Sequence, residues 1–176
     1  MIDAGKSDAE VADECFPAWC RYHNAFTKYR LLQAGCRNWK TKVIILYGDT
    51  GVGKSRYCRE KFPAAYWKGR DKWFDCYTAQ EVVIIDDYYG WLPLDFLLRL
   101  CDRYPFDVEV KGSKTAFLAK FIVFTSNVHW TKWYDFDKLG ETRKAAFGRR
   151  IDVEFYWSET DRNAIETIDN LIGEEE

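Results

Sequence analysis

The sequence predicts an α/β fold in which a parallel sheet is flanked by helices. The candidate strands are three continuous apolar runs, at Val43–Tyr47, Val82–Ile85 and Phe121–Phe124. Runs of this kind are typical of parallel strands, because crossover helices bury both faces of the sheet. Helical segments alternate with these runs, and a glycine-rich octet follows the first of them, as expected of an α/β protein that binds phosphate.

Length and composition place the chain among soluble globular proteins. The 176 residues suffice for one domain with a hydrophobic core and a small appendage, and 47% of them are hydrophobic. A net charge of −2 argues against nonspecific coating of nucleic acid but leaves room for a local basic patch. No apolar run approaches the roughly 18 residues that span a membrane, so no membrane partner is expected.

The N-terminal part of the sequence predicts a small helical domain. Residues 1–7 are expected to be a disordered or added lead, and residues 8–38 a helical unit. Its aromatic residues recur at three- and four-residue spacing, which gives one apolar stripe: Trp19, Tyr22, Phe26 and Tyr29. Pro17 favours a helix start and Gly35 a stop. The stripe can pack against the rest of the domain or against a neighbouring subunit.

The octet after the first apolar run is a complete phosphate-binding loop, G-x-x-x-x-G-K-[ST]. Its residues are Gly48, Asp49, Thr50, Gly51, Val52, Gly53, Lys54 and Ser55. Because it lies between a strand and a helix expected at Ser55–Lys61, it predicts a P-loop nucleoside triphosphatase (NTPase). Lys54 is expected to reach the β and γ phosphates of ATP, and Ser55 to hold Mg²⁺ through its hydroxyl.

The second apolar run ends in two carboxylates, Asp86 and Asp87, in the form of a Walker B motif. Asp86 is the candidate Mg²⁺ ligand, directly or through water, and Asp87 the candidate for polarising the attacking water. On its own, an Asp pair at a strand end is equally compatible with a solvated loop. The complete phosphate loop upstream favours the catalytic interpretation.

The third apolar run, Phe121–Phe124, leads into Thr125, Ser126 and Asn127. Open α/β sheets bind ligands beyond the carboxyl ends of their strands, so Asn127 is expected to contact the γ-phosphate or to orient the water. In isolation Ser-Asn would be an ordinary turn. Its functional assignment depends on the other two strand ends facing the same crevice.

The remaining elements are expected in the second half of the chain. After Pro93 a helix is predicted over Leu94–Tyr104, and a last helix is predicted from a cap at Ser158 to about Ile172, before an acidic tail. Val108–Val110 and Thr115–Leu118 resemble the strands of a β-hairpin with a basic tip, formed by Lys111, Gly112, Ser113 and Lys114. Arg149 and Arg150 form a basic pair, and either could stabilise charge on a γ-phosphate or simply lie on the surface.

Together these elements resemble the superfamily 3 helicase domain of the circovirus replication-associated (Rep) proteins. The resemblance runs from about Trp39 to Trp157 and extends beyond the generic ATPase motifs. It rests on these stretches: Tyr66-Trp67-Lys68, Lys72-Trp73-Phe74-Asp75-Cys76-Tyr77, Asp86-Asp87-Tyr88-Tyr89-Gly90-Trp91-Leu92-Pro93 and Leu97-Leu98-Arg99-Leu100-Cys101-Asp102-Arg103-Tyr104-Pro105.

The resemblance implies an AAA+-like sheet in a homohexameric ring, with ATP bound between subunits. It implies that residues 8–38 form an oligomerisation domain and 39–157 the helicase domain, which leaves 158–176 as the C-terminal helix and tail expected from the residues themselves. It assigns Walker A to Gly48–Ser55, Walker B to the Asp pair, motif C to Asn127, and an arginine finger acting in trans to Arg149 or Arg150. The tip at Lys111–Lys114 would contact single-stranded DNA.

One part of such Rep proteins is not seen in the sequence. His23 and His129 are isolated rather than paired in a metal motif, and no Tyr-x-x-Lys occurs. The chain is therefore expected to be the helicase part without the rolling-circle endonuclease, and nicking is not assigned to it. The host nucleus is expected as its location from the viral resemblance alone, because no basic targeting cluster is present.

The predicted function is that of an ATP-dependent DNA helicase in a viral replication initiator, using Mg²⁺ and translocating on single-stranded DNA during rolling-circle replication. Two alternatives stay open. The strand could be RNA, because related superfamily 3 domains occur in RNA viruses. The chain could also be an origin-binding scaffold that uses ATP only for assembly, although the two Walker B carboxylates argue against that.

Overall fold

The computed structural model describes residues 8–157 and 162–173, and the chain divides into two compact units, 1–36 and 37–176. The expected lead at residues 1–7, the cap at Ser158 and the tail at Glu174–Glu176 lie outside the described residues.

The first unit is helical, as the sequence predicts. It contains α1 (Asp8–Glu14) and α2 (Phe16–Ala34), with a proline in the first turn of α2 and Gly35 at its end at φ 74°. Within α2, the rings of Tyr22 and Phe26 lie 6.4 Å apart. Tyr22 keeps 50% of its surface exposed and Tyr29 46%, so the aromatic stripe is only partly covered in this unit.

The second unit is built on a five-stranded sheet in which every pairing is parallel, in the order β2-β3-β6-β1-β7. Its strands are β1 (Lys42–Tyr47), β2 (Tyr66–Trp67), β3 (Val82–Ile85), β6 (Phe121–Ser126) and β7 (Val153–Tyr156). The predicted α/β class and all three predicted strands are confirmed. β2 and β7 were not expected, because β2 is too short to give a pattern and alternate residues of β7 are exposed.

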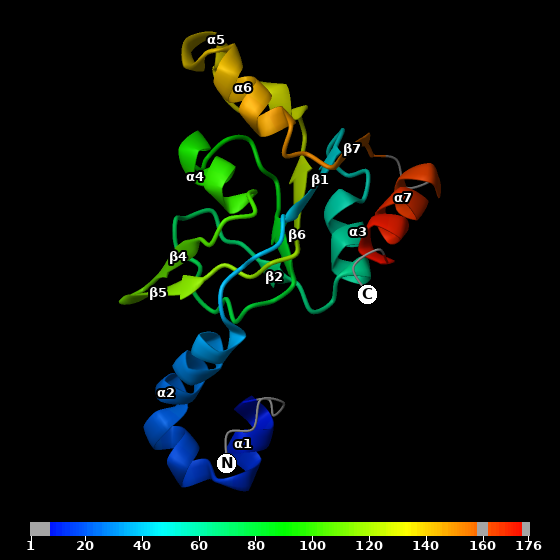
Figure 1. Ribbon diagram of the computed structural model, residues 1–176. Helices are drawn as coiled ribbons and strands as arrows, with labels where there is room; N and C mark the ends of the chain where they lie inside the picture. The colour runs from blue at the N-terminus through cyan, green and yellow to red at the C-terminus, as the bar shows by residue number, and fades with distance from the viewer. Residues whose placement is uncertain (1–7, 158–161, 174–176) are drawn as a thin grey trace. The chain divides into compact units, whose positions relative to one another are not determined.

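Alternate residues of each strand face opposite sides of the sheet and enter separate cores. In β1, Ile44 and Leu46 pack with α3 (Lys54–Lys61) and with α7 (Arg162–Gly173), which supplies Ala164 and Ile168. Figure 1 shows α3 and α7 next to each other on this side. The sheet is therefore covered by helices, as the continuous apolar runs predict.

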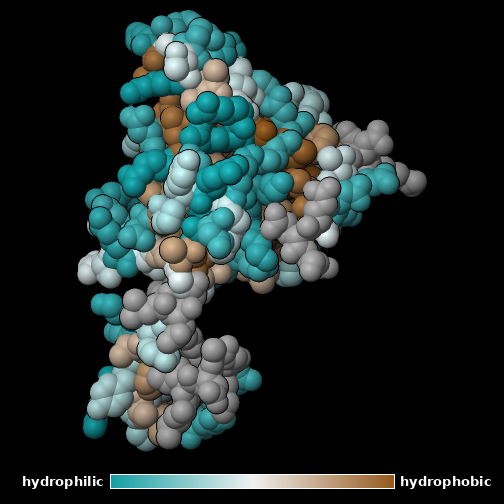
Figure 2. Space-filling view, viewed as in Figure 1, coloured by the Kyte–Doolittle hydropathy of each residue, from teal (hydrophilic) through white to brown (hydrophobic). Residues whose placement is uncertain are grey.

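The opposite face of β1, with Val43 and Ile45, packs against the elements that follow β3. These are α4 (Leu94–Leu100), the antiparallel hairpin of β4 (Asp107–Val110) and β5 (Ser113–Ala116), the 3₁₀ helix Trp130–Lys132, α5 (Phe136–Leu139) and α6 (Glu141–Gly148). On the face of this unit seen in Figure 2, hydrophilic residues dominate and hydrophobic ones show in small groups between them. No helix of the described part combines the length and the apolarity needed to cross a bilayer.

Two predicted boundaries are wrong. The helix expected over Leu94–Tyr104 ends at Leu100, because the buried guanidinium of Arg37 takes the carbonyls of Arg99 and Leu100 at 3.0 and 2.7 Å. Arg37 also binds the carbonyl of Tyr104 at 2.7 Å, which holds the chain after the helix in a non-helical path.

The second strand of the hairpin starts at Ser113 rather than at Thr115, since Val110 pairs directly with Ser113. Only Lys111 and Gly112 are left in the turn, and Gly112 has φ 79°. A turn of two residues needs this positive φ, which glycine adopts without strain.

Candidate nucleotide-binding and hydrolysis site

Three strand ends converge at the carboxyl edge of the sheet. Gly48 follows β1, Asp86 follows β3 and Asn127 follows β6. The strands are parallel and in register, with Tyr47 opposite Ser126 and Ile85 opposite Phe124, so these ends lie at one level. This is the edge at which open α/β sheets bind ligands.

The side chain of Lys54 contacts two of these strand ends, those of β1 and β6. Its Nζ donates to the carbonyls of Gly48 and Asp49 at 2.8 and 2.7 Å, and to Oδ1 of Asn127 at 3.3 Å. Lys54 is 7% exposed, and burial lowers its pKa, while the carboxylates of Asp87, Asp49 and Asp86 act in the opposite direction. The structure thus brings the predicted Lys54 and Asn127 into contact.

The loop Gly48–Ser55 joins β1 to the first turn of α3. Gly53 lies at φ 87° as the N-cap of α3, so the helix begins at Lys54 directly behind the loop. A left-handed residue at this position turns the chain sharply from the loop into the helix. The first N–H groups of α3 and its positive dipole end therefore face the space beside Lys54, where an anion is stabilised.

Ser55, Asp86 and Thr125 form a cluster of oxygen atoms. Oδ1 of Asp86 accepts hydrogen bonds from the hydroxyls of Ser55 and of Thr125, both at 2.6 Å. Hydroxyl and carboxylate oxygens are the hard donors that Mg²⁺ takes, alongside phosphate and water oxygens. The predicted pair, Ser55 and Asp86, therefore fits Mg²⁺.

Thr125 was not predicted as a site residue, although it lies at the end of a buried apolar run. Its hydroxyl oxygen also accepts a hydrogen bond from the backbone of the second carboxylate residue, because the N–H of Asp87 donates to Oγ1 of Thr125 at 2.8 Å. A polar residue at the end of a continuous apolar strand is the signal that could have found it.

Asp87 has a different environment from Asp86. It lies at φ 50°, in the left-handed region, which turns its carboxylate toward Asn127. Oδ1 accepts from Nδ2 of Asn127 at 3.1 Å, and Oδ2 forms an ion pair with Arg70. Arg70 was not predicted, because the residues between β2 and β3 carry no strand or helix pattern.

A cavity of about 450 Å³ lies in front of these groups. Its lining is Thr50, Gly51, Gly53, Lys54, Ser55, Arg56, Asp86, Asp87, Thr125 and Asn127. The lining combines the first turn of α3, including the ammonium of Lys54, with the carboxylates of Asp86 and Asp87. This arrangement suits a polyphosphate together with a divalent cation.

Arg149 and Arg150 do not line this cavity, within the residues that the structure describes. Arg150 binds Oδ2 of Asp102 and the carbonyl of Ala146, at 2.6 and 2.5 Å, and its side chain is 16% exposed. Arg149 follows the end of α6 and is exposed. Arg150 is therefore held by contacts within its own protomer, whereas Arg149 is exposed to solvent.

The hairpin residues also lie apart from this cavity. Lys111 and Gly112 form the turn between β4 and β5, and Ser113 and Lys114 are the first residues of β5. Nζ of Lys111 lies 3.1 Å from Oδ2 of Asp75, an exposed ion pair that sequence patterns did not reveal.

The parallel sheet, the phosphate loop and the strand-end carboxylates define a P-loop NTPase-like domain of the helicase type. Residues 44–128 match the family model described as RNA helicase. The replication-associated protein of goose circovirus is 54% identical over 134 residues, which cover 74% of this chain and 45% of that protein. The resemblance to circovirus Rep proteins that the motifs predict is confirmed.

Two further relatives are also replication-associated proteins of circoviruses. The replication-associated protein of porcine circovirus 1 is 46% identical over 69% of this chain and 39% of its own length. That of canary circovirus is 39% identical over 89% of this chain and 53% of its own length. The chain thus spans about half the length of these relatives, and corresponds to their helicase-containing part.

Proposed function

We propose that this chain hydrolyses ATP and uses the energy to move single-stranded DNA, as the helicase part of a viral replication initiator. The observation that carries the proposal is the convergence of Lys54, Asp86 and Asn127 on one cavity, through contacts made from three different strand ends. Each of these residue types suits one part of a triphosphate–Mg²⁺ complex.

In this proposal the loop Gly48–Ser55 binds the β and γ phosphates, and Lys54 leaves the carbonyls of its own loop to reach them. Mg²⁺, held by Ser55 and Asp86, would neutralise charge on the phosphates. Asn127 orients the water. Asp87 takes a proton from that water as its oxygen bonds to the γ-phosphorus and the bond to the bridging oxygen breaks, which yields ADP and phosphate.

Arg149 is the better candidate for an arginine finger in trans. Its exposure lets it reach a neighbouring protomer, whereas Arg150 is engaged with Asp102. A finger of this kind requires a ring or a similar closed assembly in which each site borrows a residue from the next protomer. We propose the homohexamer that the resemblance implies, with self-association through residues 8–38.

We propose further that Lys111 and Lys114 bind the phosphate backbone of single-stranded DNA. Both lie at the turn end of the hairpin, where an exposed ammonium can bind a phosphate without a desolvation penalty. Replication of a circular viral genome would place the protein in the host nucleus.

Two alternatives make different predictions. An RNA-directed ATPase would be stimulated more strongly by single-stranded RNA than by DNA of the same sequence. A scaffold that uses ATP only for assembly would bind nucleotide and oligomerise without releasing phosphate.

The proposal is tested by comparing Lys54→Ala with Lys111→Ala. Lys54→Ala is expected to remove nucleotide binding and phosphate release together. Lys111→Ala is expected to weaken binding of labelled oligothymidylate, measured by fluorescence anisotropy, while phosphate release without DNA persists. Normal turnover in Lys54→Ala would overturn the ATPase assignment, and normal DNA affinity in Lys111→Ala would overturn that of the hairpin.

A further inference from the structure

One loop carries an ion pair with the nucleotide site at one end and an ion pair with the hairpin at the other. This loop, residues 68–76, follows β2, and we call it the β2 loop. Arg70 pairs with Asp87 of the nucleotide site, and Asp75 pairs with Lys111 of the hairpin turn. Sequence motifs assign a function to neither Arg70 nor Asp75.

The β2 loop is folded around a buried lysine. Nζ of Lys68 donates to the carbonyls of Gly69 and Asp71, both at 2.6 Å, and its side chain is 0% exposed. The same ammonium lies 4.9 Å from the ring centre of Phe74 and 5.5 Å from that of Trp91. A buried ammonium that loses its acceptors is costly, so the loop is expected to move as a unit rather than to unravel.

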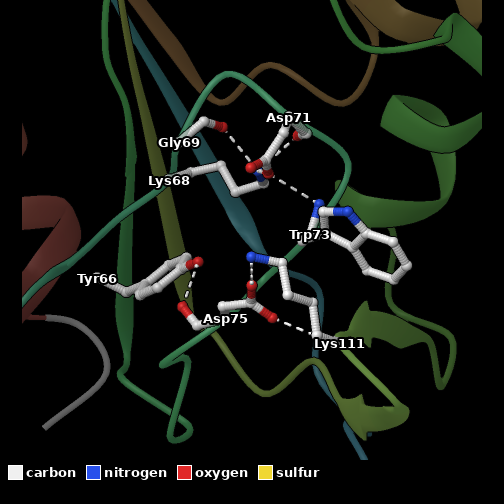
Figure 3. A network of polar contacts seen from close by, with 7 residues as sticks. All are labelled: Tyr66, Lys68, Gly69, Asp71, Trp73, Asp75 and Lys111. Carbon is white, nitrogen blue, oxygen red and sulfur yellow. Dashed lines mark hydrogen bonds and ion pairs between the residues drawn. The ribbon is translucent and has the colours of Figure 1, made fainter.

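The hairpin end of the loop is fixed to both backbone and side chain. Asp75 accepts the N–H of Lys111 through Oδ1 at 2.8 Å and faces its Nζ through Oδ2 at 3.1 Å, as Figure 3 shows. The N–H of Phe74 donates to the carbonyl of Glu109 at 2.7 Å, and Lys72 pairs with the Glu109 carboxylate at 3.2 Å. Residues of the β2 loop are therefore bound to both the strand and the turn of the hairpin.

The other end restrains the acid proposed to activate water. Arg70 holds Oδ2 of Asp87 while Asn127 occupies Oδ1, so both oxygens of this carboxylate have a donor. The guanidinium of Arg70 also lies 5.7 Å from the ring centre of Tyr89. A carboxylate whose two oxygens both hold donors of the protein has fewer lone pairs left for the attacking water.

We propose that the β2 loop couples strand binding to hydrolysis, with Arg70 as a positioning residue that restrains Asp87. A DNA phosphate competes with Asp75 for Lys111, because both are anions that the same ammonium can bind. When Lys111 turns to the strand, Asp75 loses its ion-pair partner, the loop shifts, and Arg70 releases Asp87. The inference rests on the proposed function, since it takes Asp87 as the base and Lys111 as a DNA contact.

The test compares Arg70→Ala, Arg70→Lys and Asp75→Asn in the full chain, with and without saturating oligothymidylate. Because the Arg70–Asp87 pair is solvent-exposed, Arg70→Ala is expected to raise basal kcat for ATP by about two- to fivefold. The KM for ATP should stay unchanged, and the ratio of stimulated to basal rate should fall toward one. Arg70→Lys retains a cation and is expected to restore that ratio.

Asp75→Asn tests the other end of the loop. An asparagine still accepts the N–H of Lys111 but loses the ion pair with its ammonium, so the turn keeps its shape. This variant is expected to bind oligothymidylate more tightly and to have a raised basal rate. Lys138→Ala removes an exposed ion pair with Asp135 at the start of α5, at 2.7 Å, and serves as the matched control with wild-type rates.

The outcomes separate the coupling from the proposed function. If the wild-type chain releases no phosphate, or DNA does not accelerate release, the proposed function and the coupling both fail. If DNA accelerates the wild type and Arg70→Ala equally, or if Arg70→Ala lowers the basal rate, the coupling alone is wrong. An unchanged DNA affinity in Asp75→Asn would also overturn the coupling.

Discussion

The hydroxyl of Ser55 donates to Oδ1 of Asp86 over 2.6 Å, although the two residues follow different strands of the sheet. The contact joins the end of the phosphate loop to the first Walker B carboxylate. Two oxygen ligands that are already neighbours need little rearrangement to share one cation, because the fold has fixed their separation.

Ser55→Ala is expected to raise the Mg²⁺ concentration needed for half-maximal ATPase activity by about tenfold or more, since it removes the hydroxyl that we propose as a Mg²⁺ ligand beside Asp86. Nucleotide affinity without metal should change little. A magnesium titration of phosphate release provides the measurement. Thr142→Ala, which removes a hydroxyl from the exposed surface of α6, should titrate like the wild type. An unchanged titration for Ser55→Ala would remove this residue from the metal site.

Arg149→Ala and Arg150→Ala are expected to impair different properties: Arg150→Ala the stability of the fold, and Arg149→Ala the rate of phosphate release. Arg150→Ala breaks the ion pair with Asp102, whose two side chains are only 16% and 24% exposed, and should cost about 2 kcal/mol in urea unfolding. Arg149→Ala should leave stability within about 0.5 kcal/mol of wild type, because its side chain is exposed. Its rate of phosphate release should fall by about 10³-fold if it acts as a finger.

A mixing experiment shows whether Arg149 acts on a neighbour. Arg149→Ala protomers keep an intact phosphate loop, and Lys54→Ala protomers keep Arg149. Mixing the two inactive proteins should therefore restore part of the activity at shared interfaces. A mixture as inactive as its components would argue against action in trans.

Gly90→Ala is expected to destabilise the second unit by more than about 3 kcal/mol. A Cβ at this position would lie 1.9 Å from the carbonyl oxygen of Trp133, and φ is 96°. Gly140 has nearly the same φ, 89°, but a Cβ there would meet nothing within 4 Å in the described part of the chain. The loss of free energy of unfolding in Gly140→Ala should therefore come from backbone strain alone, about 1–3 kcal/mol. Urea unfolding of both variants measures their free energies of unfolding. Equal losses of that free energy would contradict the close approach of Gly90 to Trp133.

The sequence predicted those parts of the fold that depend on local patterns. β1, β3 and β6 are continuous apolar runs because both of their faces are buried, and the phosphate loop is a fixed motif. Their convergence also followed from the sequence, since parallel strands expose their carboxyl ends at one edge.

What the sequence did not reveal depends on partners far along the chain. The end of α4 is set by Arg37, which lies 63 residues before Leu100, and no local signal marks Leu100 as its last residue. Arg70 and Asp75 lie in a loop without periodicity, and their importance arises only when folding brings Asp87 and Lys111 beside them. Charged loop residues are usually solvated, so patterns alone favour no function for them.

The hydroxyls of Tyr88 and Tyr134 lie 2.6 Å apart, and Tyr134 donates to the carbonyl of Leu92 at 2.7 Å. Burial raises the pKa of Tyr134 from 10.0 to about 12. Because the folded state holds this proton more tightly than the unfolded state, the resulting stability is complete below pH 10 and is lost as the pH rises through about 12.

Tyr134→Phe is therefore expected to be less stable than wild type at neutral pH, by about 1 kcal/mol for the lost hydrogen bonds. Between pH 10 and 12 its stability should fall less steeply than that of wild type, because one tyrosine no longer titrates in that window. Urea unfolding at successive pH values, followed by circular dichroism, measures both effects. Tyr104→Phe is the matched control, since Tyr104 is 68% exposed, and its curve should parallel the wild type. If Tyr134→Phe also paralleled the wild type from neutral to alkaline pH, the buried hydroxyl pair would contribute nothing to alkaline unfolding.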